Sequence, residues 1–235
     1  MALLVMMAAF PTRAAAQEQT PDQGKDLVVV SGGVDIDVAT FGYGGATFAV
    51  PGFSIGQGPA VRVSGFGGVY SFNSGGGPVR GKVDARFGGG EGDVLYQFSS
   101  SNLWVNLGAG ARYVDTTFSP KQPTNRRRGA QWEPALVIDG GAANGPWRGD
   151  WFASYGTTLS DYEVRASLTH TVTSNIRLGL EGETDGDPTY EEERVGPYAG
   201  LSLARNAEIQ VSAGVSAGSA RSTGAYGRLG FYAGF

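Results

Sequence analysis

The sequence contains no cysteine and a single histidine, and only 17% of its 235 residues are charged. Without cysteine the chain has neither a disulfide framework nor a thiolate metal site, and no acylated cysteine can anchor it to lipid. No segment reaches the roughly 18 to 20 consecutive apolar residues that a membrane-spanning helix needs. The net charge of −4 argues against a nucleic-acid partner, because phosphate binding relies on a basic surface.

Glycine, in contrast, is abundant, with 39 residues scattered among valine, alanine, tyrosine, phenylalanine, leucine and threonine. Scattered glycine is typical of strands that bend or pack closely, not of a linker. After a polar spacer, the chain becomes a series of segments in which apolar and polar residues alternate, and no helical periodicity is long enough to predict a helix. The pattern predicts an all-β protein and excludes most α/β enzymes.

The clearest alternating segment covers residues 103–114. Its odd-numbered residues, from Leu103 to Tyr113, are apolar or aromatic, whereas the even-numbered residues include Asn106 and Arg112. A soluble sandwich would also bury one face of each strand and wet the other, so alternation alone does not separate it from a barrel.

Three further features favour a membrane barrel. Short turns alternate with longer connections at residues 73–78, 116–130 and 184–189, as periplasmic turns alternate with external loops. Aromatic residues collect near the expected strand ends, like the girdles at a membrane interface. Ionisable groups of both signs stand in the middle of the polar faces, where they need partners in a lumen. We therefore predict a closed antiparallel up-and-down transmembrane β-barrel.

The expected strands number about twelve, and an even count brings both chain ends to the periplasmic side. The glycines at residues 88–90 could interrupt the fourth strand. Ten or fourteen strands are also compatible with the pattern. The expected ranges are 27–37, 39–50, 60–72, 79–98, 103–115, 131–142, 147–157, 162–172, 176–183, 190–203, 207–216 and 224–235.

The last eight residues carry an assembly signal. Arg228, Gly230 and Phe235 occupy the polar, glycine and terminal aromatic positions of a pattern similar to the sorting signal of bacterial outer-membrane barrels. Ala233 departs from this pattern, since an aromatic residue is more usual there. The apolar residues of this strand share one face, as a strand between lipid and a polar lumen requires.

The beginning of the chain predicts an export segment. Residues 2–10 form an apolar run, and the alanines at 14–16 supply a small-residue cleavage site, although the usual basic start is missing. A buried apolar strand or helix is the alternative. The expected organisation is a signal peptide over 1–16, a periplasmic spacer over 17–25 and an outer-membrane β-barrel over 26–235.

Several short motifs point to a known family. Residues 179–181 read Gly-Leu-Glu, Gly186 marks a turn, and residues 190–196 read Tyr-Glu-Glu-Glu-Arg-Val-Gly before a strand. A Gly-Tyr-Gly-Gly stretch at 42–45 and the strand start at 129–133 accompany them. In these motifs the chain resembles the bacterial cellulose biosynthesis protein BcsS family of small outer-membrane proteins. The resemblance implies a role in making or exporting cellulose and supplies no catalytic residue.

The polar strand faces predict the lining of the lumen. Tight pairing of its charges would form a polar plug, whereas a gap between them would leave a narrow passage. Trp104, Tyr198 and Tyr232 also point inward and are candidates for contacting a glucan, because a neutral cellulose chain is usually held by aromatic faces. The expected lumen-lining residues are Arg112, Glu133, Asp139, Arg148, Asp150, Glu163, Arg165, Arg177, Glu181, Glu183 and Arg194.

Candidates for catalysis are few. His170 lies on the apolar face of its strand, with no acidic residue two positions away on that face to orient it, which favours a lipid-facing or interfacial position over a catalytic base. Ser160 or Ser167 would be its partner in an enzyme acting on lipid A, but Ser167 points the opposite way. Glu181 and Glu183 share a face at roughly 6 to 7 Å, a spacing common to any two alternating residues. We therefore expect no catalytic residue.

Two loop segments are candidate ligand sites, and each also has an interpretation that involves no ligand. The acidic cluster at residues 185–193 could bind a divalent cation, and Arg126, Arg127 and Arg128 could clamp phosphates or an anionic polymer. We interpret the first as a solvated external loop and the second as a mobile charged loop. Residues 88–92 lack the Gly-Lys-Ser/Thr ending of a phosphate-binding loop. No metal and no cofactor are expected.

The first hypothesis is a non-enzymatic barrel in the outer membrane of a Gram-negative bacterium that supports cellulose biosynthesis or secretion, as the resemblance implies. A general small channel or adhesin-like surface barrel is the alternative, and a lipid A-modifying enzyme is a third. Expected partners are outer-membrane lipid and lipopolysaccharide, the barrel assembly machinery, and cellulose or components of its synthesis, with no nucleic acid.

Overall fold

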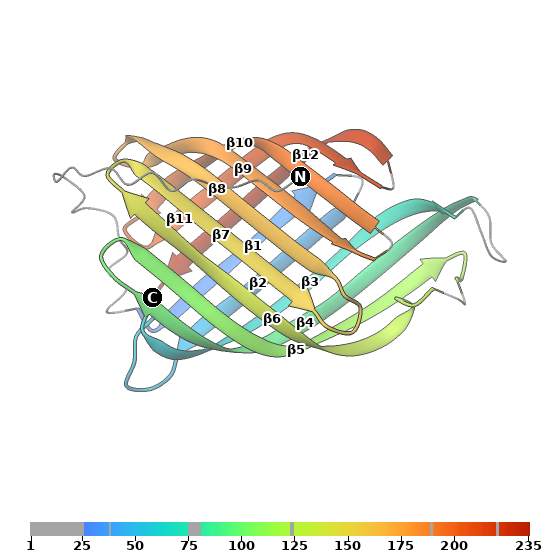
Figure 1. Ribbon diagram of the computed structural model, residues 1–235, viewed down its shortest axis with the longest axis horizontal. Helices are drawn as coiled ribbons and strands as arrows, with labels where there is room; N and C mark the ends of the chain where they lie inside the picture. Colours follow the sequence, from blue (N-terminus) through green and yellow to red (C-terminus); the bar gives the residue numbers. More distant parts are fainter. Residues whose placement is uncertain (1–25, 38, 75–80, 123–124, 189, 220) are drawn as a thin grey trace.

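The computed structural model describes residues 26–37, 39–74, 81–122, 125–188, 190–219 and 221–235. The expected signal peptide and spacer lie outside these ranges and stay predictions. Within them, twelve strands form one sheet that closes on itself (Figure 1). The strands are β1 (Val28–Ile36), β2 (Thr40–Ala49), β3 (Gly58–Ser74), β4 (Gly81–Ser99), β5 (Leu103–Ser119), β6 (Gly129–Asn144), β7 (Trp147–Gly156), β8 (Tyr162–Thr173), β9 (Ile176–Asp187), β10 (Tyr190–Ala204), β11 (Ala207–Gly218) and β12 (Arg221–Gly234).

Every strand pairs antiparallel with its neighbours in sequence, and β12 pairs with β1. This closure satisfies the backbone groups of both edges, which a sheet in hydrocarbon cannot leave unpaired. The predicted closed up-and-down barrel is confirmed. No stretch of the described residues forms a helix long and apolar enough to cross a membrane.

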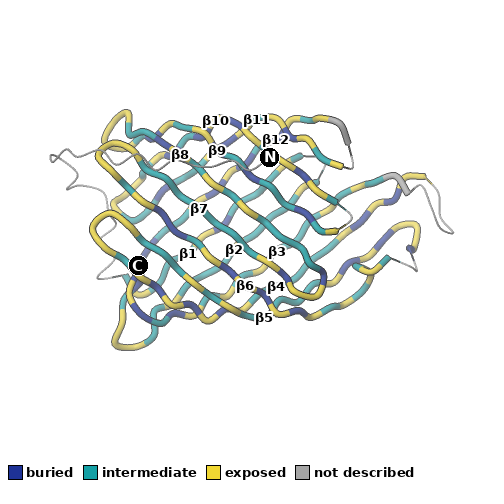
Figure 2. The backbone as a smooth tube through the Cα atoms, in the orientation of Figure 1, coloured by how far each residue is buried: buried dark blue, intermediate teal, exposed yellow. Residues whose placement is uncertain are grey.

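The distribution of apolar and charged residues in the barrel is the reverse of that in a soluble domain. Val94 and Leu180 are 67% and 63% exposed on the outer face, whereas Asp93 and Arg177 on the inner face are only 2% and 4% exposed. Figure 2 shows this alternation of exposed and buried positions along the strands. An apolar exterior around a charged interior is stable only when lipid surrounds it.

Strand β4 passes through three consecutive glycines without interruption and changes polarity along its length. Its outer face carries Val94 at one end and the exposed Lys82 and Asp84 at the other, while its inner face changes from Asp93 to the fully buried Val83. The β3–β4 hairpin therefore leaves the lipid and enters water at its outer end, where it extends beyond most other strands (Figure 1).

Two connections differ from expectation. The prediction of a loop over residues 184–189 is wrong, because β9 continues to Asp187 and β10 begins at Tyr190. The carboxylates in this segment have arginine partners inside the barrel, so the segment continues as strand instead of turning out into water. The β2–β3 connection at residues 50–57 is long for a periplasmic turn. It folds back toward the barrel, where the Gly56 amide donates to Gln97 Oε1 at 3.0 Å.

The last residue completes the seam between β12 and β1. The Phe235 amide donates to the Val28 carbonyl at 2.8 Å, and the Leu27 amide donates to the Phe235 carbonyl at 2.7 Å. The Phe235 side chain is 70% exposed on the outer face. Its ring therefore makes little contact within the folded barrel, and its contribution has to be sought during assembly.

We expect Phe235→Ala to reduce the amount of folded barrel in the outer membrane, because the terminal aromatic residue is the one that the assembly signal displays. The measurement is the heat-modifiable band on an unboiled gel. Phe231→Ala is the matched control, since Phe231 is 48% exposed on the same strand. Equal losses in both variants, or none in either, would contradict the sorting-signal interpretation.

Candidate functional site in the barrel interior

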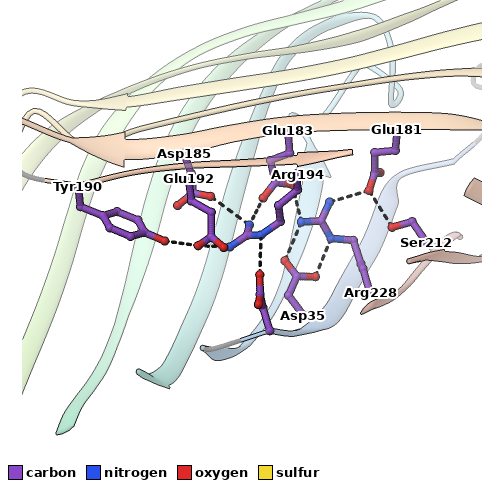
Figure 3. A network of polar contacts seen from close by, with 10 residues as sticks. Asp35, Glu181, Glu183, Asp185, Tyr190, Glu192, Arg194, Ser212 and Arg228 are labelled. Carbon is purple, nitrogen blue, oxygen red and sulfur yellow. Dashed lines mark hydrogen bonds and ion pairs between the residues drawn. The ribbon is translucent and has the colours of Figure 1, made fainter. Parts of the chain in front are cut away.

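The interior of the barrel is organised by arginines, and the most central is Arg228 of β12 (Figure 3). Its Nε and Nη2 lie 2.6 and 2.7 Å from the two carboxylate oxygens of Asp35 on β1. Its Nη1 lies 3.0 Å from Glu181 Oε1, and its Nη2 also pairs with Glu183. Ser212 Oγ donates to Glu181 Oε1 at 2.8 Å. One guanidinium thus joins β12 to β1 and β9 in a site where its side chain is only 6% exposed.

Arg194 of β10 extends this network toward the external end. It pairs with Glu183 and Glu192, and its Nη1 lies 3.0 Å from Asp185 Oδ1. The Tyr190 hydroxyl in turn contacts Glu192 (Figure 3). Strand parity explains the arrangement, because the alternate residues of β9 and β10 all face inward. A buried charge without a partner would be costly, so the acidic and basic residues stabilise one another.

A second network lies nearer the periplasmic end. Arg177 Nε lies 3.1 Å from Glu208 Oε2, and Arg177 Nη1 lies 3.0 Å from Thr169 Oγ1. Asp150 connects Arg177, at 3.6 Å, to Arg148, whose Nε lies 2.9 Å from Asp150 Oδ1. This network holds β7, β8, β9 and β11 together.

A third group of ion pairs lines β3 to β6. Arg62 Nη2 lies 2.9 Å from Asp93 Oδ2, and Arg62 Nη1 lies 3.2 Å from Asp139 Oδ1. Arg112 Nε lies 2.5 Å from Glu91 Oε2, and Arg112 Nη1 lies 3.9 Å from Glu133 Oε1. Charges of opposite sign therefore meet on this side of the barrel as well.

The structure brings most of the expected lumen residues into these three networks. Glu163 and Arg165 lie on the same face of β8, opposite the exposed Val164, and the Arg165 guanidinium carbon lies 5.6 Å from the Phe152 ring centroid. The residues that sequence reasoning missed are their partners on other strands. The same parity rule, applied to the glycine-rich strands, could have found them: Asp35, Arg62, Glu91, Asp93 and Glu208.

The three aromatic candidates gather around the periplasmic network. The Tyr198 hydroxyl donates to Glu208 Oε1 at 3.4 Å, and Tyr232 is the cross-strand partner of Glu208. A Cβ added to Gly141 would lie 2.6 Å from both Trp104 Nε1 and Asp150 Oδ1, which places Trp104 beside the same network. Tyr198 is only 6% exposed, so its ring is largely covered.

The external mouth is crossed by contacts of two segments that were expected to be a mobile charged loop and a solvated acidic loop. Arg127 Nε lies 2.6 Å from Asp187 Oδ2, and the Arg126 guanidinium donates to the Leu159 carbonyl. The Asp187 side chain is 4% exposed. The expectation of a solvated acidic loop and a mobile charged loop is therefore corrected for Asp187 and Arg127, which pair with each other. The residues of the two segments that are exposed include Arg126, Arg128, Glu191 and Glu193.

The catalytic candidates are separated from one another. His170 packs edge-on against Trp147, with ring centroids 4.8 Å apart, on the outer face of β8. Ser167 lies on the opposite face, and Ser160 lies in the β7–β8 connection with a φ of 56°. Glu181 and Glu183 are both engaged by Arg228. Within the described ranges, no group of three or more histidine, aspartate or glutamate side chains is placed to hold a metal ion.

A family model described as cellulose biosynthesis protein BcsS matches residues 29–235, which is nearly the whole described barrel. The chain belongs to the BcsS family. With its apolar exterior and closed sheet, this BcsS protein is located in the bacterial outer membrane, where its outer face contacts lipid. No curated protein sequence matches it.

The chain is similar to several solved structures at low sequence identity. The KdgM porin is 10% identical, with 88% of this chain and 99% of that chain covered and a TM-score of 0.52. The transport unit of the autotransporter AIDA-I from Escherichia coli is 10% identical over 91% and 92% of the two chains, with a TM-score of 0.48. The outer membrane protease OmpT from Escherichia coli is 11% identical over 94% and 100%, with a TM-score of 0.36. The likeness to the KdgM porin concerns the barrel fold alone.

We expect Arg228→Met to destabilise the barrel by about 3 to 5 kcal/mol, since it leaves buried carboxylates without their main cation. The measurement is urea unfolding of the purified barrel refolded into lipid vesicles. Arg86→Met is the control, because Arg86 is exposed on the outer face of the external extension of β4. A similar small effect in both variants would show that the Arg228 network contributes little to stability.

We also expect the double variant Arg127→Ala, Asp187→Asn to raise the single-channel conductance in planar bilayers, because it removes the ion pair that crosses the external mouth. Lys82→Ala, which removes an exposed cation of the outer hairpin, should leave conductance unchanged. If the double variant conducts like the unchanged protein, the mouth contacts do not limit the passage of ions.

Proposed function

We propose that this protein is a non-enzymatic outer-membrane barrel that supports cellulose biosynthesis or secretion. The match to the BcsS family over residues 29–235 is the observation that carries the proposal. The interior chemistry supports it. The carboxylates that could act as acid and base are held by arginines, and His170 lies apart from both serine candidates. Carboxylates paired in this way are suited to stabilising the barrel wall rather than to catalysis.

The eleven expected lumen residues then serve as a polar lining that fixes the shape of the interior. Trp104 and Tyr232 contact a neutral glucan at the periplasmic end, and Tyr198, whose ring is largely covered, holds Glu208 beside them. Arg228, Gly230 and Phe235 serve as the signal for the assembly machinery, and the export segment over residues 1–16 is removed before insertion. Lipopolysaccharide surrounds the external half of the barrel.

A deletion strain tests the role in cellulose production. We expect extracellular cellulose to fall severalfold, while glucan synthesis from the nucleotide sugar in isolated membranes is unchanged, because the barrel acts after polymerisation. Plasmid-borne protein should restore the polymer outside the cell. Unchanged extracellular cellulose in the deletion strain, or an equal loss of synthase activity in membranes, would contradict the proposal.

A further inference from the structure

The inner wall formed by β1 to β4 carries ion pairs such as that between Arg62 and Asp93, but next to them it also carries a group of aromatic rings and glycines. Strands β1 to β4 are neighbours in the sheet (Figure 1). Their register places two adjacent rows of inward-facing residues across them. One row reads Gly33, Tyr43, Phe66 and Gly89, and the next reads Asp35, Phe41, Gly68 and Phe87.

The glycines in these rows let the rings lie against the wall. A Cβ added to Gly89 would lie 2.9 Å from Phe66 Cζ, and one added to Gly68 would lie 2.9 Å from Phe87 Cε1. A Cβ on Gly33 would lie 2.8 Å from the Tyr43 hydroxyl. Each of these three rings therefore covers the glycine directly opposite it on the neighbouring strand. Any other residue at that glycine would place its Cβ against the ring. A ring in this position turns one face to the sheet and the other to the interior.

The rings form a continuous surface. Phe41 lies between three of them, with centroid distances of 5.7 Å to Tyr43, 6.4 Å to Phe66 and 6.0 Å to Phe87. Phe87 continues to Tyr70 at 6.0 Å. Phe41, Tyr43, Phe66 and Phe87, here called the aromatic platform, are half-buried and lie outside the two buried apolar clusters of the described residues. They therefore present accessible ring faces toward the lumen and are not a closed core.

The charges around the aromatic platform favour a neutral ligand. Asp35, which ends one row, is held by two bonds from Arg228. Most arginines of the interior have carboxylate partners, and Arg165 lies over the Phe152 ring. Those with carboxylate partners include Arg62, Arg112, Arg127, Arg148, Arg177, Arg194 and Arg228. Cations already engaged in this way are poorly placed to hold an acidic polymer. Ser64 and Glu91, cross-strand partners in the next row, supply polar groups beside the rings.

We propose that the aromatic platform binds a neutral β-linked glucan chain inside the barrel. The flat CH face of a glucose ring stacks on an aromatic face, while its equatorial hydroxyls reach polar groups at the edge. Neighbouring ring centroids are separated by about the length of one sugar unit, so successive units can move from ring to ring. The choice of a glucose polymer rests on the proposed function, whereas the stacking surface rests on the contacts described above.

The test uses the full barrel in lipid nanodiscs and cellohexaose as the probe, with binding measured by titration calorimetry. We expect the double variant Phe66→Ala, Phe87→Ala to bind at least about tenfold more weakly, as loss of stacked rings does at other stacking sites. Phe48→Ala with Phe98→Ala is the matched control, because these rings are 43% and 53% exposed on the outer faces of β2 and β4. The control should bind like the unchanged protein.

A conservative variant guards against a folding defect. Phe66→Tyr with Phe87→Tyr keeps both rings and should keep the affinity, provided that heat modifiability confirms a closed barrel in every variant. Unweakened binding by the alanine variant, equal weakening in the outer-face control, or no binding of cellohexaose to the unchanged protein would each overturn the inference. The deletion phenotype is measured separately, so the proposed function can survive the failure of the aromatic platform, and the reverse also holds.

Discussion

The barrel depends on the seam at which its last strand meets its first, and the ion pair between Arg228 and Asp35 lies on the inner face of that seam. The two residues face each other in the register of β12 and β1, and the arginine donates to both carboxylate oxygens. At this seam β1 and β12, which lie at opposite ends of the described chain, pair with each other and close the sheet. Because Arg228 also reaches Glu181 and Glu183, the seam is tied to β9, three strands away.

The sequence predicts the fold well because a barrel in lipid imposes the same rule on every strand. Alternation in residues 103–114 appears in the structure as Leu103 and Leu107 exposed outside and Arg112 paired inside. Partners were harder to predict. Nothing in the local pattern indicates that Arg62 on β3 meets Asp139 on β6, since that contact depends on the size and curvature of the closed sheet.

The ion pair across the external mouth could not be predicted from the sequence either. It explains why the loop expected at residues 184–189 is strand in the structure. Residues 184–189 are acidic and contain glycine and proline, which favours a turn when the segment is considered alone. In the structure Asp187 meets Arg127, and the surrounding carboxylates meet Arg194, so pairing overrides the local preference. The aromatic platform on β2 to β4 was not predicted for a related reason. Its rings form one surface because of the glycines opposite them, and the strand register that pairs rings with glycines is not evident from the sequence.

The reversal of polarity along β4 fixes how deep the barrel sits. Moving the barrel inward would bring Lys82 and Asp84 into hydrocarbon, and moving it outward would expose Val94 to water. Both displacements are costly, so the membrane holds the cylinder at one height. The outer ends of β3 and β4 are therefore held at a set distance above the lipid, among the sugars of the bacterial surface.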